Sequence, residues 1–498
     1  MNKLIILILI LGTIYKLLMT WHGNFLFNMD NARDMVDVRE MVVLGKLRLI
    51  GPTSAIEGLY NGPAWYYLLT IPFIVSGGDP YASIMMEIIL WAIGGFFLLK
   101  IISQWSKWLI IPIGFVWIAS DYIGLTTQYA FNPNPVPLLS PLFIYLLYKY
   151  LQTNKLVLIS SAFFLGGLFF NFEMNFGLFI PPIIFITTLI TKRNLLKTQN
   201  FWLGSLFFLL CLLPQVLFEV RHNFFMTNAI INYLRNIDGS YNLILRSQSL
   251  FESFLGVFSA TLMNHKTFTL LILIFLIPAT VNAFKKKELL IVVSAVYILL
   301  PFLFYLFLPV SVNAWHLGAE AAALVILIGF LIKTLWDLSL KGKLIAMIVA
   351  IILIIYSLSN ISNFLFRDRF RENSDPSLYK NELGAIDYVY QYANGQNFKV
   401  YTYLPSVYDY PYQYLFWWYG NKKYGFIPAE YVYSPNKPRY IPSQEKFQGK
   451  KENISGLVFL IKEPDRIKMR QAWENDFKDM EFISKEWVGP LEVEIRKE

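Results

Sequence analysis

The residues most able to do chemistry stand together at positions 29–34, which read Met-Asp-Asn-Ala-Arg-Asp and follow a hydrophobic N-terminal stretch. A helix that begins at Asp30 places Arg33 and Asp34 on one side, because residues i, i+3 and i+4 share a helical face. A carboxylate within hydrogen-bond reach of a hydroxyl can accept its proton as a general base. Just outside a membrane, such acids are placed to act on a substrate with a lipid anchor.

The same helix has a simpler interpretation. Its acids continue with Asp37 and Glu40, while the opposite side is apolar, so the pattern also fits an amphipathic helix whose acids only face water. The loop that contains it, residues 22–80, is long for a connection between hydrophobic runs, and such loops are usually functional. The sequence leaves both interpretations open.

Three further polar stretches lie between hydrophobic runs. Asn132 and Asn134 form a proline-rich turn, where they either end a helix or offer amides to a cavity. Glu173 follows an apolar run, and because burying its charge in a bilayer would cost about 2.5–3.5 kcal/mol, we expect it to face water or a polar cavity. Arg221 and His222 open the segment 220–266, where cations suit a lipid phosphate but equally form a basic interfacial rim.

Several other chemistries are not supported. None of the histidines has metal-ligand spacing such as HExxH, and Cys211 is the single cysteine, so no dedicated metal site and no intramolecular disulfide are predicted. The chain has no Walker loop, no GxSxG motif and no GxGxxG in a βαβ context. ATP hydrolysis, serine-hydrolase chemistry and a Rossmann cofactor are therefore not expected.

The composition predicts a polytopic α-helical membrane protein. Of the 498 residues, 56% are hydrophobic and only 15% are charged, whereas soluble domains carry roughly 25% charged residues. The net charge of +9 does not indicate a nucleic-acid partner, because many lysines and arginines stand between apolar runs, as topology signals do.

About eleven apolar runs are long enough to cross a bilayer. The first is expected to be an uncleaved span, since no small-residue cleavage site precedes His22. Ala64–Ser76 is too short to span and is expected to be re-entrant or interfacial. The predicted spans are residues 4–21, 81–102, 107–123, 135–151, 156–172, 174–190, 200–219, 267–284, 288–309, 315–333 and 343–363.

The distribution of basic residues predicts the topology. With a cytoplasmic N-terminus, every inner loop contains lysine or arginine, as the positive-inside rule requires. The outer segments are then 22–80, 124–134, 220–266 and everything after about residue 364. We therefore expect a multi-pass protein of the cell (inner or plasma) membrane, with its active face and its C-terminal part outside the cytoplasm.

The sequence changes character at residue 364, which predicts two domains, 1–363 and 364–498. In the second part the hydrophobic runs shorten to strand length, at residues 398–404, 456–461, 482–487 and 491–495, and helical patterns lie near 380–394 and 464–477. We expect a small extracytoplasmic α/β domain. Its aromatic segment Tyr408–Tyr419 fits either a packed core edge or a platform for sugar rings.

These stretches, in this order, look like a family. The first outer loop presents Asp30 and Arg33, and further along it Asn61-Gly62-Pro63 is followed by Tyr66-Tyr67-Leu68. The chain thereby resembles the polytopic GT-C glycosyltransferases that use polyprenyl-phosphate sugars. Within that superfamily it is similar to bacterial relatives of the dolichyl-phosphate-mannose protein mannosyltransferases and of the lipid A aminoarabinose transferase.

The resemblance implies a reaction and a site. A sugar passes from a polyprenyl-phosphate donor to a hydroxyl of a glycan, lipid or protein acceptor, with inversion and no required cofactor. Asp30 would be the base, Arg33 its orienting partner and Asp34 the fallback base. The implied substrate-binding residues are Asn61, Tyr66, Asn132, Asn134, Glu173, Arg221 and His222.

Two departures from the family pattern concern a metal. Asn31 stands where the family has a second acid, and Asn132 and Asn134 stand where a carboxylate of the second outer loop would help hold a divalent cation. A divalent metal is therefore compatible with the resemblance but is not required by the sequence.

Two other classes of function remain open from the sequence. A transporter or flippase of lipid-linked glycans would place ionisable groups near the bilayer midplane, and Glu87 and Glu320 fit that description. A non-catalytic assembly or sensor protein would use the C-terminal domain to bind a partner. Substitution of Glu87 and Glu320 should destroy a transporter and only mildly affect the enzyme, whereas Asp30→Asn should be silent in an assembly or sensor protein.

Overall fold

The computed structural model describes residues 2–236, 242–308, 312–368, 374–435, 440–450, 454–465 and 467–498. The chain forms two compact units that alternate along the sequence. The membrane unit comprises Met1–Leu18, Arg48–Leu68 and Met85–Arg369, and the C-terminal unit comprises Met19–Leu47, Leu69–Ile84 and Phe370–Glu498. The predicted domain boundary at residue 364 stays a prediction. Two parts of the loop 22–80 belong to the same compact unit as the C-terminal residues.

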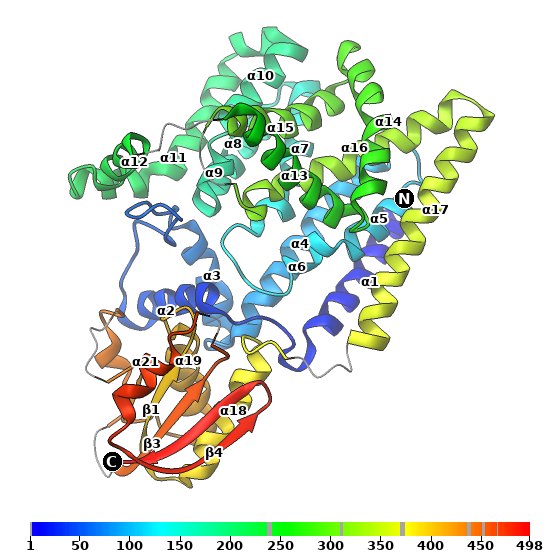
Figure 1. Cartoon of the computed structure of the whole chain (residues 1–498). Coiled ribbons are helices and arrows are strands. Elements are labelled where there is room, and N and C mark those ends of the chain that lie inside the picture. The colour runs from blue at the N-terminus through cyan, green and yellow to red at the C-terminus, as the bar shows by residue number, and fades with distance from the viewer. Residues whose placement is uncertain are drawn as a thin grey trace. The chain divides into compact units, whose positions relative to one another are not determined.

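The protein is a multi-pass membrane protein built on long apolar helices (Figure 1). In the described residues, eight helical segments are long and apolar enough to cross a bilayer. They are Asn2–Gly23 (α1 with η1), Pro80–Ile102 (α4), Met174–Lys197 (α9, α10 and η2), Gln199–Arg221 (α11), Lys266–Lys285 (α14), Leu289–Phe307 (α15), Ala314–Leu338 (η3 with α16) and Leu340–Phe366 (α17 with the start of η4).

The other three predicted spans are helical but are not counted among the helices long and apolar enough to cross a bilayer. They correspond to α5 (Ile110–Ala119) with α6 (Asp121–Leu125), to α7 (Pro135–Thr153) and to α8 (Leu156–Phe172). Ser120 ends α5 and caps α6 by accepting a hydrogen bond from the backbone N–H of Ile123 at 3.2 Å, which divides the predicted span 107–123 in two. The short run Ala64–Ser76 forms the 13-residue helix α3, too short to span by itself.

Close helix packing depends on glycine at one place in the membrane unit. A Cβ atom on Gly94 of α4 would lie 1.7 Å from the carbonyl oxygen of Leu138 in α7, so no larger residue fits there. Small residues at such crossings let helix backbones approach within a bilayer, where the hydrophobic effect does not drive association. Two further helices, α12 (Phe225–Arg235) and α13 (Leu243–Leu262), complete this unit.

The C-terminal unit contains the predicted α/β domain. Its five-stranded sheet has the order β2-β1-β3-β5-β4, with β1 parallel to β2 and β3, and β5 antiparallel to β3 and β4. The four predicted strands are confirmed as β1 (Asn397–Tyr403), β3 (Ile454–Lys462), β4 (Glu481–Val488) and β5 (Leu491–Lys497), while the short β2 (Glu430–Val432) was not predicted. Figure 1 shows α18 (Tyr379–Ala393), the first predicted helix, beside the sheet.

The second helical pattern, 464–477, was predicted too long. Among the described residues of this range, only α21 (Arg470–Glu474) and the 3-10 turn η7 (Asn475–Phe477) form. The buried side chains of Trp473 and Phe477 pack against Tyr401 and Tyr403 of β1, so this short helix closes one part of the core.

Helix α2 (Met29–Leu44) carries the candidate acids and is built into the C-terminal unit. It packs on α19 (Tyr410–Leu415) of the aromatic segment, which continues into η5 (Phe416–Gly420). Arg39 is 1% exposed and its guanidinium lies 3.8 Å from the ring centre of Phe447 and 5.2 Å from that of Trp417. It also donates a hydrogen bond to the backbone oxygen of Gln413 at 3.3 Å.

Replacing Arg39 should destabilise the C-terminal unit. Arg39→Ala removes the stacked guanidinium and leaves a cavity, which should cost about 2–5 kcal/mol. Arg39→Lys should also lower the melting temperature, because an ammonium keeps the charge but lacks the planar guanidinium that packs against the two rings. Thermal unfolding of the detergent-solubilised chain measures both, with the exposed Arg235→Ala as the matched control. A melting temperature of Arg39→Ala equal to that of the control would contradict this packing.

Candidate functional site

Asp30 lies in the first turn of α2, where the helix start is fixed by a side-chain cap. Asn28 is the N-cap, and its side-chain oxygen accepts a hydrogen bond from the backbone N–H of Asp30 at 3.1 Å. A carboxylate in a first helical turn is favoured by the positive end of the helix dipole. The predicted start of the helix is thus confirmed to within one residue.

Arg33 joins the two candidate acids. Its Nη1 donates to Asp30 Oδ1 at 3.1 Å, while its Nε and Nη2 donate to Asp34 Oδ1 at 3.0 and 2.9 Å. The side chains of Asp34, Arg33 and Asp30 are 0%, 12% and 38% exposed. Arg33 therefore fixes both carboxylates, but only that of Asp30 remains open to an incoming hydroxyl.

The interpretation of α2 as a helix whose acids merely face water is wrong. Asp34 and Glu40 are 0% and 2% exposed, and Glu40 lies 3.6 Å from the ammonium of Lys46. Asn31 is also buried and donates to the backbone oxygen of Leu26 at 2.8 Å. Buried ionised groups are tolerated only when they are paired, so this face of α2 is a built polar interior.

In the membrane unit, Asn61 belongs to a tightly packed turn. Its side-chain oxygen accepts a hydrogen bond from the backbone N–H of Met174 at 3.1 Å, and its backbone pairs with Gly51 and Pro52. A Cβ on the adjacent Gly62 would lie 1.9 Å from Asn171 Oδ1, so glycine is required there. Tyr66 is only 3% exposed. These residues position the loop 48–68 against the start of α9.

Asn132 and Asn134 use their amide groups within the protein. Asn132 Nδ2 donates to the backbone oxygen of Phe172 at 2.6 Å, and Asn134 Nδ2 donates to those of Tyr129 and Thr126 at 2.8 and 3.2 Å. Both side chains are buried. Their Nδ2 groups hold the turn together, which matches the simpler of the two predicted roles.

Glu173 lies between α8 and α9 in a buried polar cluster. Its Oε1 accepts hydrogen bonds from the backbone N–H and the side-chain Nδ2 of Asn175 at 3.2 and 2.8 Å. Burial raises the pKa of Glu173 to about 7, and the two hydrogen bonds oppose that rise only in part. Asn175 Nδ2 also lies 3.2 Å from His316 Nε2, so the acid faces a polar cluster rather than lipid, as predicted.

His222 borders a hollow in the membrane unit, whereas Arg221 is exposed at the end of α11 and does not line it. The hollow has a volume of about 560 Å³. The imidazole of His222 stacks on Phe218 with ring centres 4.1 Å apart, and its Nδ1 lies 2.9 Å from the Phe218 carbonyl oxygen. Amide side chains dominate the polar lining, which includes Asn223, Asn228, Asn232, Asn236 and also Tyr60 and Glu57.

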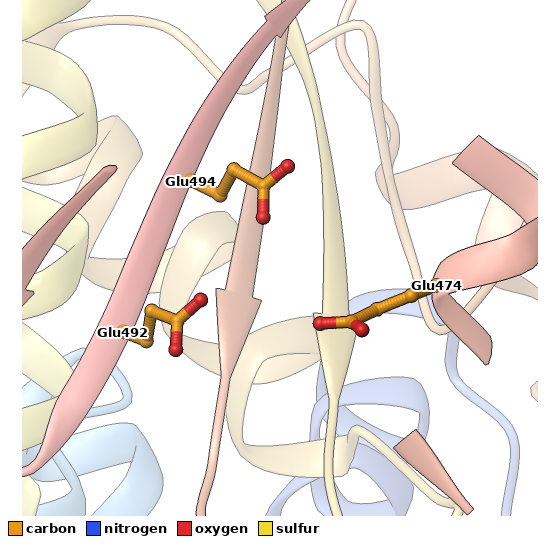
Figure 2. A group of neighbouring side chains, drawn as sticks. All are labelled: Glu474, Glu492 and Glu494. Atoms are coloured by element: carbon orange, nitrogen blue, oxygen red, sulfur yellow. The ribbon is translucent and has the colours of Figure 1, made fainter. Parts of the chain in front are cut away.

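Figure 2 shows three carboxylates that converge in the C-terminal unit, those of Glu474, Glu492 and Glu494. Such a group could hold a metal ion, but a buried ammonium already stands among them. Lys462 Nζ lies 2.8 Å from Glu474 and 3.4 Å from Glu492 and also bonds Glu494. Arg470 pairs with Glu474 and Glu492, and Arg496 pairs with Glu494. The cluster is charge-balanced by these cations and does not fit a metal ion.

Some functional-site features were not apparent from the sequence. Asn171 bonds the backbones of Gly167 and Cys211 through its Nδ2 and that of Ala64 through its Oδ1, joining three segments that are far apart along the chain. The sequence pattern did not assign Arg39 to the acidic or to the apolar face of α2. No local pattern marks such residues, because each has a partner far away along the chain, 107 positions from Asn171 and 374 positions from Arg39.

The aromatic segment Tyr408–Tyr419 is mostly core, which supports the packed-edge interpretation. Tyr412, Tyr414 and Phe416 are at most 1% exposed, whereas Tyr408 is 45% exposed. The segment therefore supplies the interior of the unit, with its first residues left at the surface.

Comparison with solved structures identifies the fold. The chain is similar to ArnT from Cupriavidus metallidurans in the apo state, with 11% sequence identity, a TM-score of 0.62 and coverage of 99% of this chain and 98% of that chain. It is equally similar to the same protein bound to undecaprenyl phosphate, with 11% identity, a TM-score of 0.63 and coverage of 98% and 97%. No protein-family model and no curated protein matches the chain.

The fold expected from the resemblance is therefore confirmed over nearly the whole chain. The chain has the polytopic architecture of ArnT together with a small C-terminal α/β part.

The glutamate cluster makes the stability of the chain depend on pH. Burial alone would raise the pKa of Glu492, but hydrogen bonds and ion pairs with Arg470 and Lys462 outweigh it and hold the pKa below its usual range. A lowered pKa stabilises the fold above the unfolded value of about 4.3 and loses that contribution as the pH falls through the folded value. Glu492→Gln should thus lower stability by roughly 3 kcal/mol at neutral pH, and the difference from wild type should shrink below about pH 4.

Thermal unfolding of the solubilised chain between neutral and acidic pH tests this. The exposed Glu481→Gln on β4 is the matched control and should follow wild type at every pH. A melting-temperature difference for Glu492→Gln that stays constant with pH would contradict the assignment of the shift.

Proposed function

We propose that this protein is an inverting glycosyltransferase that moves a sugar from a polyprenyl-phosphate donor to an acceptor hydroxyl on the outer face of the membrane. The observation that carries the proposal is the half-exposed Asp30 carboxylate, held by Arg33 on a buried helix. It occurs in a chain with the fold of ArnT, of which one structure is bound to undecaprenyl phosphate.

In this reaction Asp30 accepts the proton of the acceptor hydroxyl, whose oxygen attacks the anomeric carbon. The bond from that carbon to the phosphate oxygen breaks, and polyprenyl phosphate leaves. Arg33 holds Asp30 through Oδ1, so the carboxylate keeps one orientation while the substrate approaches. Asp34 is fully buried and paired with Arg33, which suits a supporting role better than that of the base.

The leaving phosphate requires cations and hydrogen-bond donors, because its negative charge grows as the bond breaks. We assign this role to the hollow lined by His222 and four asparagines, and to Arg221, the exposed residue that precedes His222. The other predicted substrate residues are assigned by their contacts. Asn61, Tyr66, Asn132 and Asn134 shape the loops, while Glu173 supplies a titratable acid within the polar cluster.

The sidedness of the proposed reaction rests on the basic inner loops, which assign the N-terminus to the cytoplasm and the C-terminal part to the outside of the cell membrane. No step of the reaction requires a cofactor. A divalent cation remains compatible with Asp30, and donor turnover with and without a chelator decides whether one takes part.

A transporter or flippase of lipid-linked glycans is the second candidate, favoured by two buried acids within helices. Glu87 of α4 and Glu320 of α16 (Gly318–Leu338) are both fully buried. Ionisable groups inside membrane helices are costly and often belong to ion or substrate pathways. The two candidates separate cleanly, because Glu87→Gln and Glu320→Gln should abolish transport but leave donor consumption largely intact.

Substitution of the base should abolish transfer. Asp30→Asn keeps the shape and the hydrogen bond to Arg33 but cannot accept a proton, so turnover should fall by roughly 10²–10⁴-fold. The measurement is donor consumption by the protein in sealed, right-side-out vesicles, with a panel of polyprenyl-phosphate sugars and native acceptor extract, read by lipid mass spectrometry.

The matched control is Asp37→Asn, a carboxylate two turns further along α2. It should retain most of the activity. Transfer that survives in Asp30→Asn would show that another residue is the base. A wild-type protein that consumes no donor with any acceptor would contradict the proposed glycosyltransferase activity.

The hollow beside His222 should control donor affinity. His222→Gln removes a group that can carry positive charge, and a lost hydrogen bond to a charged phosphate is worth about 1.5–3 kcal/mol. The donor KM should therefore rise by roughly tenfold or more, with a smaller effect on kcat. His265→Gln, at the exposed N-cap of α14, is the control and should leave the donor KM unchanged. Equal donor KM values for wild type and His222→Gln would show that the donor phosphate does not bind in this hollow.

A further inference from the structure

A second pocket lies entirely within the C-terminal unit and is not used by the proposed chemistry. Its volume is about 660 Å³, which lies within the range of small-molecule sites. It is formed by residues near the start of α19, by β2 and the turn after it, by η6 (Gln444–Phe447) and by α21. Its lining is Val407, Tyr408, Gln413, Glu430, Val432, Tyr433, Ser434, Tyr440, Gln444, Met469, Ala472, Trp473 and Asp476.

Aromatic rings form much of the pocket wall, and they are held in place. Tyr408 and Tyr440 meet edge to face with ring centres 5.2 Å apart, and Tyr433 and Trp473 do so at 6.3 Å. Trp473 is nearly buried, and its indole N–H donates to the backbone oxygen of Tyr433 at 2.6 Å. Fixed ring faces beside polar groups favour ligands that are apolar on one face and hydroxylated at the edge, which is the character of sugar rings.

The polar side chains of the pocket are held by hydrogen bonds within the protein. Gln444 Nε2 donates to Gln413 Oε1 at 3.0 Å, and Gln413 Nε2 donates to Asp409 Oδ2 at 3.1 Å. Tyr401 donates to Glu430 Oε2 at 3.2 Å, and the hydroxyl of Ser434 donates to Asp476. The amides and carboxylates are thus oriented before any ligand arrives, which lowers the entropy that binding must overcome.

Charge restricts the class of ligand. Among the described residues that line the pocket, Glu430 and Asp476 are acidic and none is lysine, arginine or histidine. Acids repel phosphate and uronate groups but accept hydrogen bonds from hydroxyl and ammonium groups. The pocket therefore disfavours the phosphate of the donor and suits a neutral or amino-bearing sugar.

The backbone at the rim is strained. Val407 has a φ of +67°, a left-handed conformation that is unusual for a β-branched residue. Its N–H bonds the Leu404 carbonyl at 3.0 Å, and Ser406 donates from its hydroxyl to the backbone oxygen of Tyr408 at 3.2 Å. This turn presents the exposed ring of Tyr408 at the pocket, and strain of this kind is concentrated at functional sites.

One tyrosine connects the pocket to the helix that carries the candidate base. Tyr410 packs against Tyr440 and Tyr408 with ring centres 5.1 and 5.9 Å away. It also lies close enough to Asp37 and Arg33 of α2 for both charges to act on its hydroxyl. Arg33 in turn donates to Asp30 at 3.1 Å.

We propose that this pocket binds a sugar unit of the acceptor, a neutral or amino-bearing saccharide, through the rings of Tyr408, Tyr440 and Trp473 and the carboxylates of Glu430 and Asp476. This inference rests on the proposed function, because only a glycosyltransferase has an acceptor. It narrows the acceptor from a glycan, lipid or protein to a molecule that presents a sugar.

Binding to the full-length protein in detergent tests the site without turnover. A panel of neutral, amino-bearing and uronic-acid oligosaccharides is titrated, with tryptophan fluorescence and calorimetry as readouts. Wild type should bind neutral or amino-bearing members and reject uronates. Tyr408→Ala, at an exposed position that should not unfold the unit, should weaken binding by roughly tenfold or more. Tyr392→Ala, at an exposed tyrosine of α18 outside the pocket, should bind as wild type does.

Two results would overturn the inference. One is a folded wild-type protein that binds no saccharide of the panel, and the other is equal binding by wild type and Tyr408→Ala. Asp30→Asn should bind saccharide as wild type does, so the binding result can be interpreted even if the catalytic proposal fails.

Kinetics test the acceptor assignment separately. With an active donor, Tyr408→Ala and Asp476→Asn should raise the acceptor KM and leave the donor KM unchanged. A rise in the donor KM alone would assign the pocket to the donor and overturn the acceptor role.

Discussion

The position of the candidate base depends on one buried cation that is not itself part of the chemistry. The guanidinium of Arg39 lies close to the rings of Phe447 and Trp417 and donates to the backbone of Gln413, which fixes α2 in the C-terminal unit. Because guanidinium is planar and weakly hydrated, it can be buried against aromatic rings at lower cost than an ammonium. With α2 held in this way, Asp34 is fully buried, and Asp30 in the first turn is the accessible one of the two carboxylates that Arg33 binds. A carboxylate on a rigid helix keeps its geometry better than one on a loop, which general-base catalysis requires.

The two hollows described above differ in the polar groups that line them, and the ligands that we propose for them follow from this difference. The one in the membrane unit offers an imidazole and several amides beside Glu57, and the imidazole and amide N–H groups are donors that suit a phosphate. The one in the C-terminal unit offers carboxylates and aromatic rings, which suit hydroxyl or ammonium groups and the apolar face of a sugar. A transferase with a lipid-phosphate donor and a glycosylated acceptor needs both kinds of site. The glutamate cluster around Lys462 serves neither, since its charges are already paired and stabilise the sheet.

Much of the architecture could be predicted from the sequence because its signals are local. Apolar runs predicted the long helices, and alternating short runs predicted four of the five strands, while the three-residue β2 is too short to leave such a signal. The start of α2 followed from Asp30 and the helical spacing of its acids. The burial of Asp34 and Glu40 could not be predicted, because it depends on residues of α19 and the following segment hundreds of positions away. The same holds for the pocket lined by Tyr408, Tyr440 and Trp473, whose members come together only in the folded sheet domain.

The most direct test of the account is single-turnover transfer with a polyprenyl-phosphate donor whose sugar is isotopically labelled, comparing wild type with Asp30→Asn. The account predicts that wild type delivers the label to the acceptor with inverted anomeric configuration and that Asp30→Asn delivers almost none while still binding donor. Equal transfer by the two proteins, or a product with retained configuration, would contradict the assignment of Asp30 as the base of a single displacement.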